Sequence, residues 1–254
     1  MTELGRLAQS LRRAAAATRE AIAADGFTLY IARDTANPYM SLAVPDDEPP
    51  VDWAAALAAL PVAFAAHGRS ARIEVFAELQ PALLRAADAA GWRRAMTAPV
   101  LTLSPQALAP APPAVGAFGW LGPDEPGRLE AVLRGSHVAY GGADGDPAAL
   151  DWGPQLVRGL RQGTLLAGAV DVEGVPRAGA AVQLGGDAGE LAGVWTHPGF
   201  RRRGLARQAC HALLAGAFAR EVASAWLSAA EGALELYESL GFVRVGTQVN
   251  FEPP

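Results

Sequence analysis

Residues 190–206 read ELAGVWTHPGFRRRGLA, and this stretch decides the fold of the second half of the chain. Residues that favour a strand end at Thr196, and a His197-Pro198-Gly199 turn follows. The arginine run then opens a helix rich in alanine and leucine. The first turn of a helix has backbone N–H groups without partners, and it carries the positive end of the helix dipole. The stretch therefore predicts a strand, a loop and a helix entry that together form an anion site.

The loop is suited to a diphosphate. Gly204 lets a ligand approach the backbone closely, and Ala206 is too small to block it. Each charge-assisted hydrogen bond from a backbone N–H contributes about 1.5–3 kcal/mol, so several together hold a pyrophosphate. A surface cluster of arginines, or a patch for an RNA phosphate, is the alternative interpretation of Arg201, Arg202 and Arg203.

Both halves of the chain alternate between predicted strands and helices, which indicates an α/β fold. In the first half we expect helices over residues 3–24, 53–66 and 80–90, and strands over 27–33, 39–44, 71–76 and 92–103. In the second half we expect helices over 124–138, 147–161, 202–220 and 230–240, and strands over 115–120, 164–171, 177–184, 190–196, 223–228 and 243–251.

Two motifs resemble those of the GNAT N-acetyltransferases. Residues 201–206, RRRGLA, are similar to the family signature R/Q-x-x-G-x-G/A. Residues 233–242, ALELYESLGF, are similar to a second family landmark, A-x-x-LYE-x-x-GF. The resemblance covers about residues 115–254. It implies a mixed, mostly antiparallel sheet flanked by helices and splayed between its fourth and fifth strands, with acetyl-CoA in the gap.

The resemblance also implies which residues bind acetyl-CoA. Backbone amides of the loop would hold the pyrophosphate, and the strand edge would pair with the pantetheine amides through its main chain. The residues concerned are Val194, Trp195 and Thr196 on the strand, and Arg201, Arg202, Arg203, Gly204, Leu205, Ala206 and Arg207 in the loop.

The catalytic groups follow from the same resemblance. Tyr237 matches the family tyrosine that protonates the thiolate of the departing CoA, and a phenol pKa near 10 is close to that of a thiol near 8.5. Glu190 or a water chain would act as the base, because an alkyl ammonium must lose a proton before it attacks. A strand period of two predicts that Glu190, Ala192, Val194 and Thr196 share one face. Where the family often has Asn, this chain has Ala230, so that contact is missing or comes from Ser228 or Glu231.

These residues predict transfer of acetyl from acetyl-CoA to a primary amine of a small molecule or peptide. The alternative is a non-catalytic acyl-CoA-binding or regulatory protein with the same fold. A net charge of −5 and a pI near 5.4 argue against a nucleic-acid partner. The spacing of the four histidines and Cys210 indicates no metal site. We expect a monomer or a homodimer.

The first half of the chain is predicted to be a degenerate relative of the second. Proline-rich residues 105–114 would link a domain over residues 1–104 to a GNAT domain over residues 115–254. Gly91 and Gly241 each follow a predicted helix, where glycine caps the last turn in the left-handed conformation. In that alignment Ala87 stands where Tyr237 does, and residues 45–50, PDDEPP, would repel a diphosphate. We therefore expect the first domain to bind no CoA, and to wall the acceptor pocket or mimic a dimer partner.

The single cysteine and the hydropathy pattern indicate the cellular compartment in which the protein is expected. Cys210 has no partner for an internal disulfide, which fits a reducing cytoplasm. It lies on the predicted helix after the loop, and we interpret it as a small buried apolar residue. No apolar run approaches the ~20 residues that span a bilayer, so we expect no membrane partner.

Overall fold

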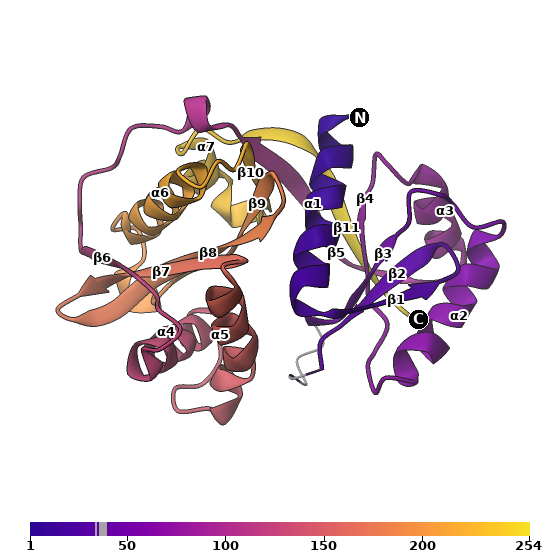
Figure 1. The fold of residues 1–254 in the computed structure, drawn as a ribbon, viewed down its shortest axis with the longest axis horizontal. Coiled ribbons are helices and arrows are strands. Elements are labelled where there is room, and N and C mark those ends of the chain that lie inside the picture. The colour runs from indigo at the N-terminus through magenta and orange to yellow at the C-terminus, as the bar shows by residue number, and fades with distance from the viewer. Residues whose placement is uncertain (34, 36–39) are drawn as a thin grey trace. The chain divides into compact units, whose positions relative to one another are not determined.

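The computed structural model describes residues 1–33, 35 and 40–254 of the chain (Figure 1). The chain divides into two compact units. The first contains residues 1–101, 228–231 and 244–254, and the second contains residues 102–227 and 232–243. The strand expected over residues 39–44 begins outside the described residues, and the structure has a strand at Leu42–Pro45.

In the first unit, the strand order is β1, β2, β3, β4, β11 and β5. Strands β1, β2 and β3 run antiparallel, β3 and β4 pair in parallel, and β11 returns antiparallel to β4. A core cluster joins α2 and α3 to one face of these strands. The elements are α1 (Glu3–Thr18), β1 (Glu20–Ala24), β2 (Phe27–Ile31), β3 (Leu42–Pro45), α2 (Trp53–Ala65), β4 (Ile73–Phe76), α3 (Pro81–Ala89), β5 (Arg93–Leu103) and β11 (Val243–Glu252).

The helix predicted over residues 3–24 is too long. It ends at Thr18, and residues 20–24 form β1, which pairs with β2 in a tight hairpin. The turn is Asp25-Gly26, in which Gly26 has φ 71°. Asp-Gly between two short apolar runs is a strong hairpin signal, and it prevails here over the helical pattern of alanines.

The last strand, β11, lies in the first unit and not with the rest of the second half. Val249 stands opposite Val75 of β4, and both Val249 and Phe251 lie in the core cluster of the first unit. The predicted boundary of one domain over residues 115–254 therefore differs from the compact units: the alternating apolar residues of β11 are buried against β4.

In the second unit, the strand order is β10, β9, β8, β7 and β6. Strands β6 to β9 run antiparallel, and β10 pairs with β9 in parallel. Helix α6 packs on β7 and β8, whereas α4 and α5 contribute to a separate core cluster with Trp195. The elements are β6 (Ala117–Trp120), α4 (Pro126–Ala139), α5 (Gly153–Gln162), β7 (Leu165–Val172), β8 (Val175–Gly185), β9 (Ala188–Thr196), α6 (Leu205–Phe218), β10 (Ser224–Ser228) and α7 (Leu234–Glu238).

The mixed, mostly antiparallel sheet and its splay are confirmed. Strand β9 pairs with β10 from Ala188 to Glu190, opposite Ser224 to Trp226. Beyond Glu190, no pair joins the two strands among the described residues, so they separate toward their carboxyl ends. Counted from β6, these are the fourth and fifth strands of the second unit.

The proline-rich segment predicted as a linker belongs to the second unit and makes specific contacts within it. The backbone N–H of Ala109 donates to the carbonyl of Leu240 at 3.0 Å, and the His211 ring lies 3.0 Å from the carbonyl oxygen of Ala109. Gly241, with φ 102°, lies against the Ala107 carbonyl so closely that a Cβ would be 2.1 Å from its oxygen. Gly91 has φ 77°, so both helix-capping glycines adopt the predicted left-handed conformation.

Trp195 is the central side chain of the core beneath α4. It is 4% exposed, and glycines border its indole ring on two elements. A Cβ on Gly135 of α4 would lie 2.8 Å from its Cη2, and a Cβ on Gly179 of β8 would lie 2.7 Å from its Nε1. Trp195 therefore fills the space that the two glycines leave.

We expect Gly179→Ala to lower the free energy of unfolding by about 2 kcal/mol, because overpacking a well-filled core typically costs 1–3 kcal/mol. The new methyl group would also lie 2.9 Å from the Gly168 carbonyl oxygen, which is main chain and cannot move aside easily. Urea unfolding measures the effect. Gly127→Ala is the matched control, since a Cβ there meets nothing within 4 Å. Equal unfolding midpoints for the two variants would contradict the prediction.

Candidate active site

The predicted loop and the second motif lie on opposite sides of one hollow of about 390 Å³ in the second unit. On one side are Thr196 and residues 202–207. On the other are Gly232, Glu235, Leu236 and Ser239. Glu235 and Ser239 were missed as candidates, although both lie in the motif around Tyr237, two residues to either side of it.

The backbone of the loop presents unpaired donors. Arg202 and Gly204 are both left-handed, with φ 63° and 82°. Helix α6 begins at Leu205 directly after Gly204, and no side chain caps its first turn. The early N–H groups of α6 are therefore available at the hollow, as the anion-site interpretation requires.

Most of the loop arginines are used to hold the loop. Arg201 donates to the Ala139 carbonyl at 2.9 Å. Arg203 donates to the Gly199 carbonyl at 3.1 Å and lies over the Phe200 ring. Arg207 donates to the Ser239 carbonyl at 3.2 Å. The Arg202 side chain, 90% exposed and 3.9 Å from Glu235, remains to meet a charged ligand.

A bulge in β9 overturns the predicted face of the strand. Ala192 stands opposite Ala181 and Trp195 opposite Gly179, so β9 has one residue more than β8 in this interval. Gly193, with φ 59°, lies within the interval. An extra residue reverses the alternation. Glu190 and Ala192 therefore share a face with Trp195, and Thr196, opposite Ala178, lies on the other face.

The edge of β9 that was predicted to bind pantetheine has a partner from the chain itself. The Tyr140 hydroxyl donates to the Val194 carbonyl at 2.9 Å. Tyr140 follows α4, and its side chain is 65% exposed. Tyr140 could not be predicted from the sequence, because no local signal connects positions 54 residues apart. The Val194 carbonyl therefore accepts from Tyr140, and a pantetheine amide would have to replace the phenol or share this acceptor with it.

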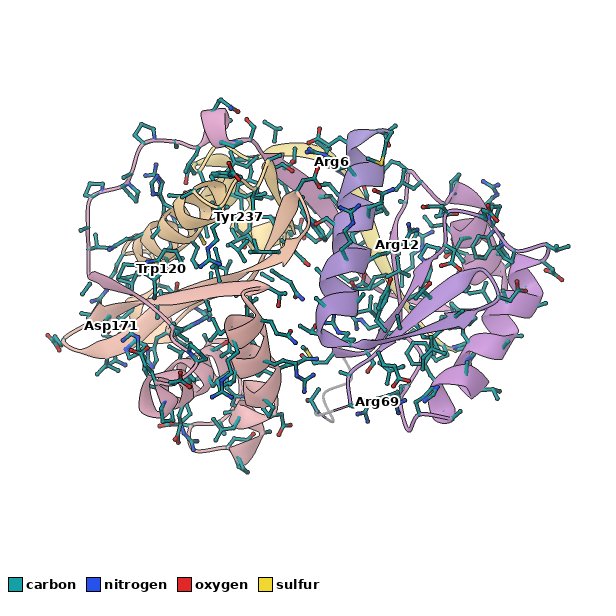
Figure 2. The ribbon with its side chains drawn as sticks, in the orientation of Figure 1. Arg6, Arg12, Arg69, Trp120, Asp171 and Tyr237 are labelled. Carbon is teal, nitrogen blue, oxygen red and sulfur yellow. The ribbon has the colours of Figure 1, made fainter. Side chains whose placement is uncertain are left out.

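Tyr237 lies on α7, 7% exposed, with its ring edge-on to Phe242 at 6.1 Å between centroids (Figure 2). Among the described residues its hydroxyl has no hydrogen-bond partner. Burial, and then the proximity of Cys210 and Tyr140, raise the pKa of the Tyr237 phenol. The phenol therefore keeps its proton through the neutral pH range, which suits a donor, although full transfer to a thiolate is more uphill than for an ordinary phenol.

Glu190 lies where the two central strands begin to separate. It stands opposite Gln183 on one side and Trp226 on the other, at the last residue pair of β9 and β10. It is neither fully buried nor fully exposed. This position at the start of the splay, on the face shared with Trp195, makes its role as a base a geometric hypothesis that stays untested.

The residues suggested to replace the missing Asn have different surroundings. Ala230 and Glu231 are exposed. Ser228 donates its hydroxyl proton to Gln248, and both residues belong to the first unit. Of the two suggested substitutes, Glu231 is therefore the one whose side chain faces solvent.

Cys210 lies on α6 and is fully buried as a free cysteine. Burial raises the pKa of its thiol to about 12. Such a thiol stays protonated and is a poor nucleophile, which agrees with its interpretation as an apolar core residue. Among the described residues, no group of three or more His, Cys, Asp or Glu side chains is arranged to hold a metal ion.

Cys210 should make the fold less stable in alkali. Above its ordinary pKa near 9 the thiol ionises in the unfolded chain, whereas in the folded chain it keeps its proton up to about pH 12. The free energy of unfolding therefore falls as pH rises through that window, by up to ~1.4 kcal/mol per pH unit. We expect Cys210→Ala to flatten this slope between pH 8.5 and 10, measured by urea unfolding. Leu213→Ala, also buried on α6, is the control that lowers stability without changing the slope. Parallel slopes in the wild type and Cys210→Ala would contradict the assignment.

Among the described residues, no helix is both long and apolar enough to cross a membrane.

The arrangement defines a class of protein. Its sheet is splayed, and the loop between the fourth strand, β9, and helix α6 leaves the first backbone amides of the helix without a side-chain cap. Comparisons with known proteins give the family. Residues 133–242 match the Acetyltransferase (GNAT) family. This segment carries the family match, and the predicted family resemblance is confirmed. A search of the curated proteins finds no match to the sequence.

Solved structures show that the whole chain has the GNAT fold. A GCN5-related N-acetyltransferase from Kribbella flavida is 24% identical, with a TM-score of 0.79 over 100% of this chain and 96% of that one. A putative GNAT acetyltransferase from Novosphingobium aromaticivorans is 20% identical, with a TM-score of 0.59 over 97% of this chain and 96% of that one. A tandem GNAT protein from the clavulanic acid biosynthesis pathway is 17% identical, with a TM-score of 0.60 over 89% of this chain and 77% of that one.

Proposed function

We propose that the chain transfers the acetyl group of acetyl-CoA to a primary amine of a small molecule or peptide. The observation that carries the proposal is the hollow in which the uncapped start of α6 faces the second motif, next to strands that separate. The residues present suit the ligand: backbone N–H groups of residues 202–206 match a diphosphate, and the Val194 carbonyl would accept from a pantetheine amide once Tyr140 releases it.

The chemistry is direct attack. The amine nitrogen attacks the thioester carbon, the C–S bond breaks, and the acetyl group remains on nitrogen as an amide. The ammonium proton leaves first, to Glu190 or to water, because the protonated amine has no lone pair. The departing thiolate takes a proton, and Tyr237 is the candidate donor, since its hydroxyl has no partner among the described residues. As the amide forms, the nitrogen loses its second proton to solvent, and a proton from solvent restores the Tyr237 hydroxyl. The bound diphosphate would replace solvent over the loop and fix the thioester relative to these groups.

The first unit, in this proposal, is a GNAT-like half that binds no CoA. It repeats the element order of the second unit: antiparallel strands, a helix, and a parallel strand that separates from its neighbour. In the first unit, the segment between β3 and α2 corresponds to the anion loop, and side chains of the same unit already occupy it. The Asp52 carboxylate caps the start of α2, and Arg12 donates to the Pro45 carbonyl and to Asp47. A diphosphate there would meet carboxylates in place of free N–H groups.

Two measurements on the full chain test the proposal. Calorimetry should show one acetyl-CoA bound per chain; two sites would contradict the role given to the first unit, and no uptake would refute the function as a whole. A thiol-release screen against a broad panel of amines should then reveal turnover. The position of Ala230, which departs from the family pattern, favours the alternative of a non-catalytic acyl-CoA binder. Binding without any thiol release across the panel would support that alternative.

A further inference from the structure

The first unit contains a cavity of about 190 Å³ between α1 and strands β3 and β4. These strands pair in parallel at Ala43 and Ile73, and the cavity lies along the residues that follow. The small residues Gly5 and Ala8 of α1 line it from the other side. The opening thus arises from the separation of two strands under a helix with short side chains.

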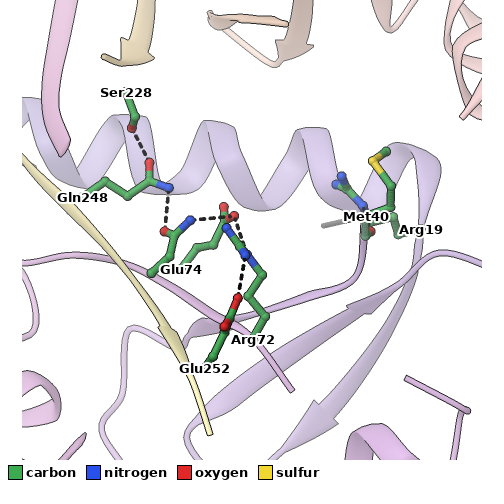
Figure 3. A network of polar contacts seen from close by, with 8 residues as sticks. Arg19, Met40, Arg72, Glu74, Ser228, Gln248 and Glu252 are labelled. Carbon is green, nitrogen blue, oxygen red and sulfur yellow. Dashed lines mark hydrogen bonds and ion pairs between the residues drawn. The ribbon is translucent and has the colours of Figure 1, made fainter. Parts of the chain in front are cut away.

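One wall of the cavity carries a buried carboxylate. The Glu74 side chain is 16% exposed, and its Oε1 pairs with the Arg72 Nε at 3.6 Å (Figure 3). The Asn250 side-chain amide lies 3.3 Å from the same oxygen. Burial raises the pKa of Glu74, against the lowering effects of the Arg72 and Arg19 charges and of a hydrogen bond with Arg72. Both contacts involve Oε1, so Oε2 is left for a cationic hydrogen-bond donor.

The facing helix carries a cation that is only partly exposed. The Arg12 side chain is 18% exposed; its Nη1 donates to Asp47 at 2.7 Å, and its Nη2 donates to the Pro45 carbonyl. Its Nε is buried, and it has no hydrogen-bond partner among the described residues. Asp47 is 76% exposed, so solvent can hydrate this carboxylate if a ligand takes its place on Arg12. Arg12 thus offers donors to an anionic group in the cavity.

Apolar residues complete the lining: Leu11 of α1, Val44 of β3 and Phe76 of β4, with Val75, whose side chain belongs to the core beside α2 and α3. They suit a short aliphatic group. A ligand with an ammonium at one end, a carboxylate at the other and a small aliphatic side chain would satisfy all three parts of the wall.

We propose that this cavity binds a small zwitterion, an α-amino acid with a short aliphatic side chain, whose ammonium contacts Glu74 and whose carboxylate contacts Arg12. The site is separate from the acetyl-CoA hollow, and the inference does not depend on the proposed transferase activity. It gives the first unit a ligand of its own in place of CoA.

The probe is L-valine, titrated into the full chain by calorimetry and by saturation-transfer NMR. Isobutylamine lacks its carboxylate and isovalerate lacks its ammonium, so each should bind at least ten-fold more weakly than valine. Equal binding of the three compounds would overturn the zwitterion assignment. Absence of any valine binding up to tens of millimolar would overturn the site.

Two variants place the ligand in the cavity. Glu74→Gln removes the charge with little change in shape, and Ala8→Leu fills the space without touching either charged group; each should weaken valine binding at least ten-fold. Asp88→Asn, which changes an exposed carboxylate of the same unit, is the matched control and should leave it unchanged. Valine binding that survives both Glu74→Gln and Ala8→Leu would refute the location. Thermal melts verify folding, and acetyl-CoA affinity should be unaltered in both variants, so a failure here is distinguishable from a failure of the transferase proposal.

Discussion

Tyr237→Phe is expected to lower kcat for acetyl transfer at least ten-fold while the Kd for CoA stays within two-fold of wild type. The substitution removes only the hydroxyl, and the ring remains edge-on to Phe242. Ten-fold corresponds to about 1.4 kcal/mol of transition-state stabilisation, a modest value for a proton donor to a leaving group. The measurement is steady-state thiol release with the best amine from the screen, together with calorimetry of CoA.

The control for this prediction is Tyr140→Phe. Tyr140 donates to Val194 in the ligand-free chain, so its loss frees a carbonyl that CoA needs and should leave kcat nearly unchanged. If Tyr140→Phe lowers kcat and Tyr237→Phe does not, the roles of the two phenols are reversed. If neither does, the thiolate leaves without a tyrosine donor.

Ala206→Asp is expected to weaken acetyl-CoA binding at least a hundred-fold. The residue occupies the second position of α6, where the positive end of the helix dipole stabilises a carboxylate. The variant should therefore be at least as stable as wild type. The same carboxylate would lie at the diphosphate. Two like charges ~5 Å apart repel by about 3 kcal/mol at an effective dielectric constant of 20, which corresponds to more than a hundred-fold in Kd.

Gly127→Asp is the matched control for the loop. It adds one carboxylate to the first turn of α4, in open space, and changes the net charge of the chain equally. Calorimetry should find its acetyl-CoA affinity near that of wild type. A loss of similar size in both variants would mean that net charge, and not the loop, governs binding. Unchanged affinity in Ala206→Asp would remove the loop from the binding site.

The anion loop could be predicted from sequence because its signals are local. A turn, a glycine with positive φ and a small residue in the first turn of a helix all lie within residues 197–206, and the structure forms them as expected. The splay was predicted only through the family resemblance. Its physical basis, parallel pairing that ends at Glu190, joins strands that are distant in the chain.

Predictions from the sequence failed where two local patterns compete, or where a residue's contact lies far away in the chain. The alternation in β9 looked regular, but Gly193 inserts a bulge that reverses the faces of the strand. The Asp25-Gly26 turn was overlooked within an alanine-rich helix pattern. Tyr140 and the cavity beside Glu74 depend on tertiary contacts, which periodicity does not encode.

The placement of β11 has a consequence for synthesis on the ribosome. The first unit needs a strand between β4 and β5 that is translated more than 140 residues after β5 begins, because β11 starts at Val243 and β5 at Arg93. Until that strand emerges, β4 exposes an unsatisfied edge to the nascent-chain environment. The two units therefore reach their final form together, and a truncation between them would leave the amino-terminal one without an inner strand.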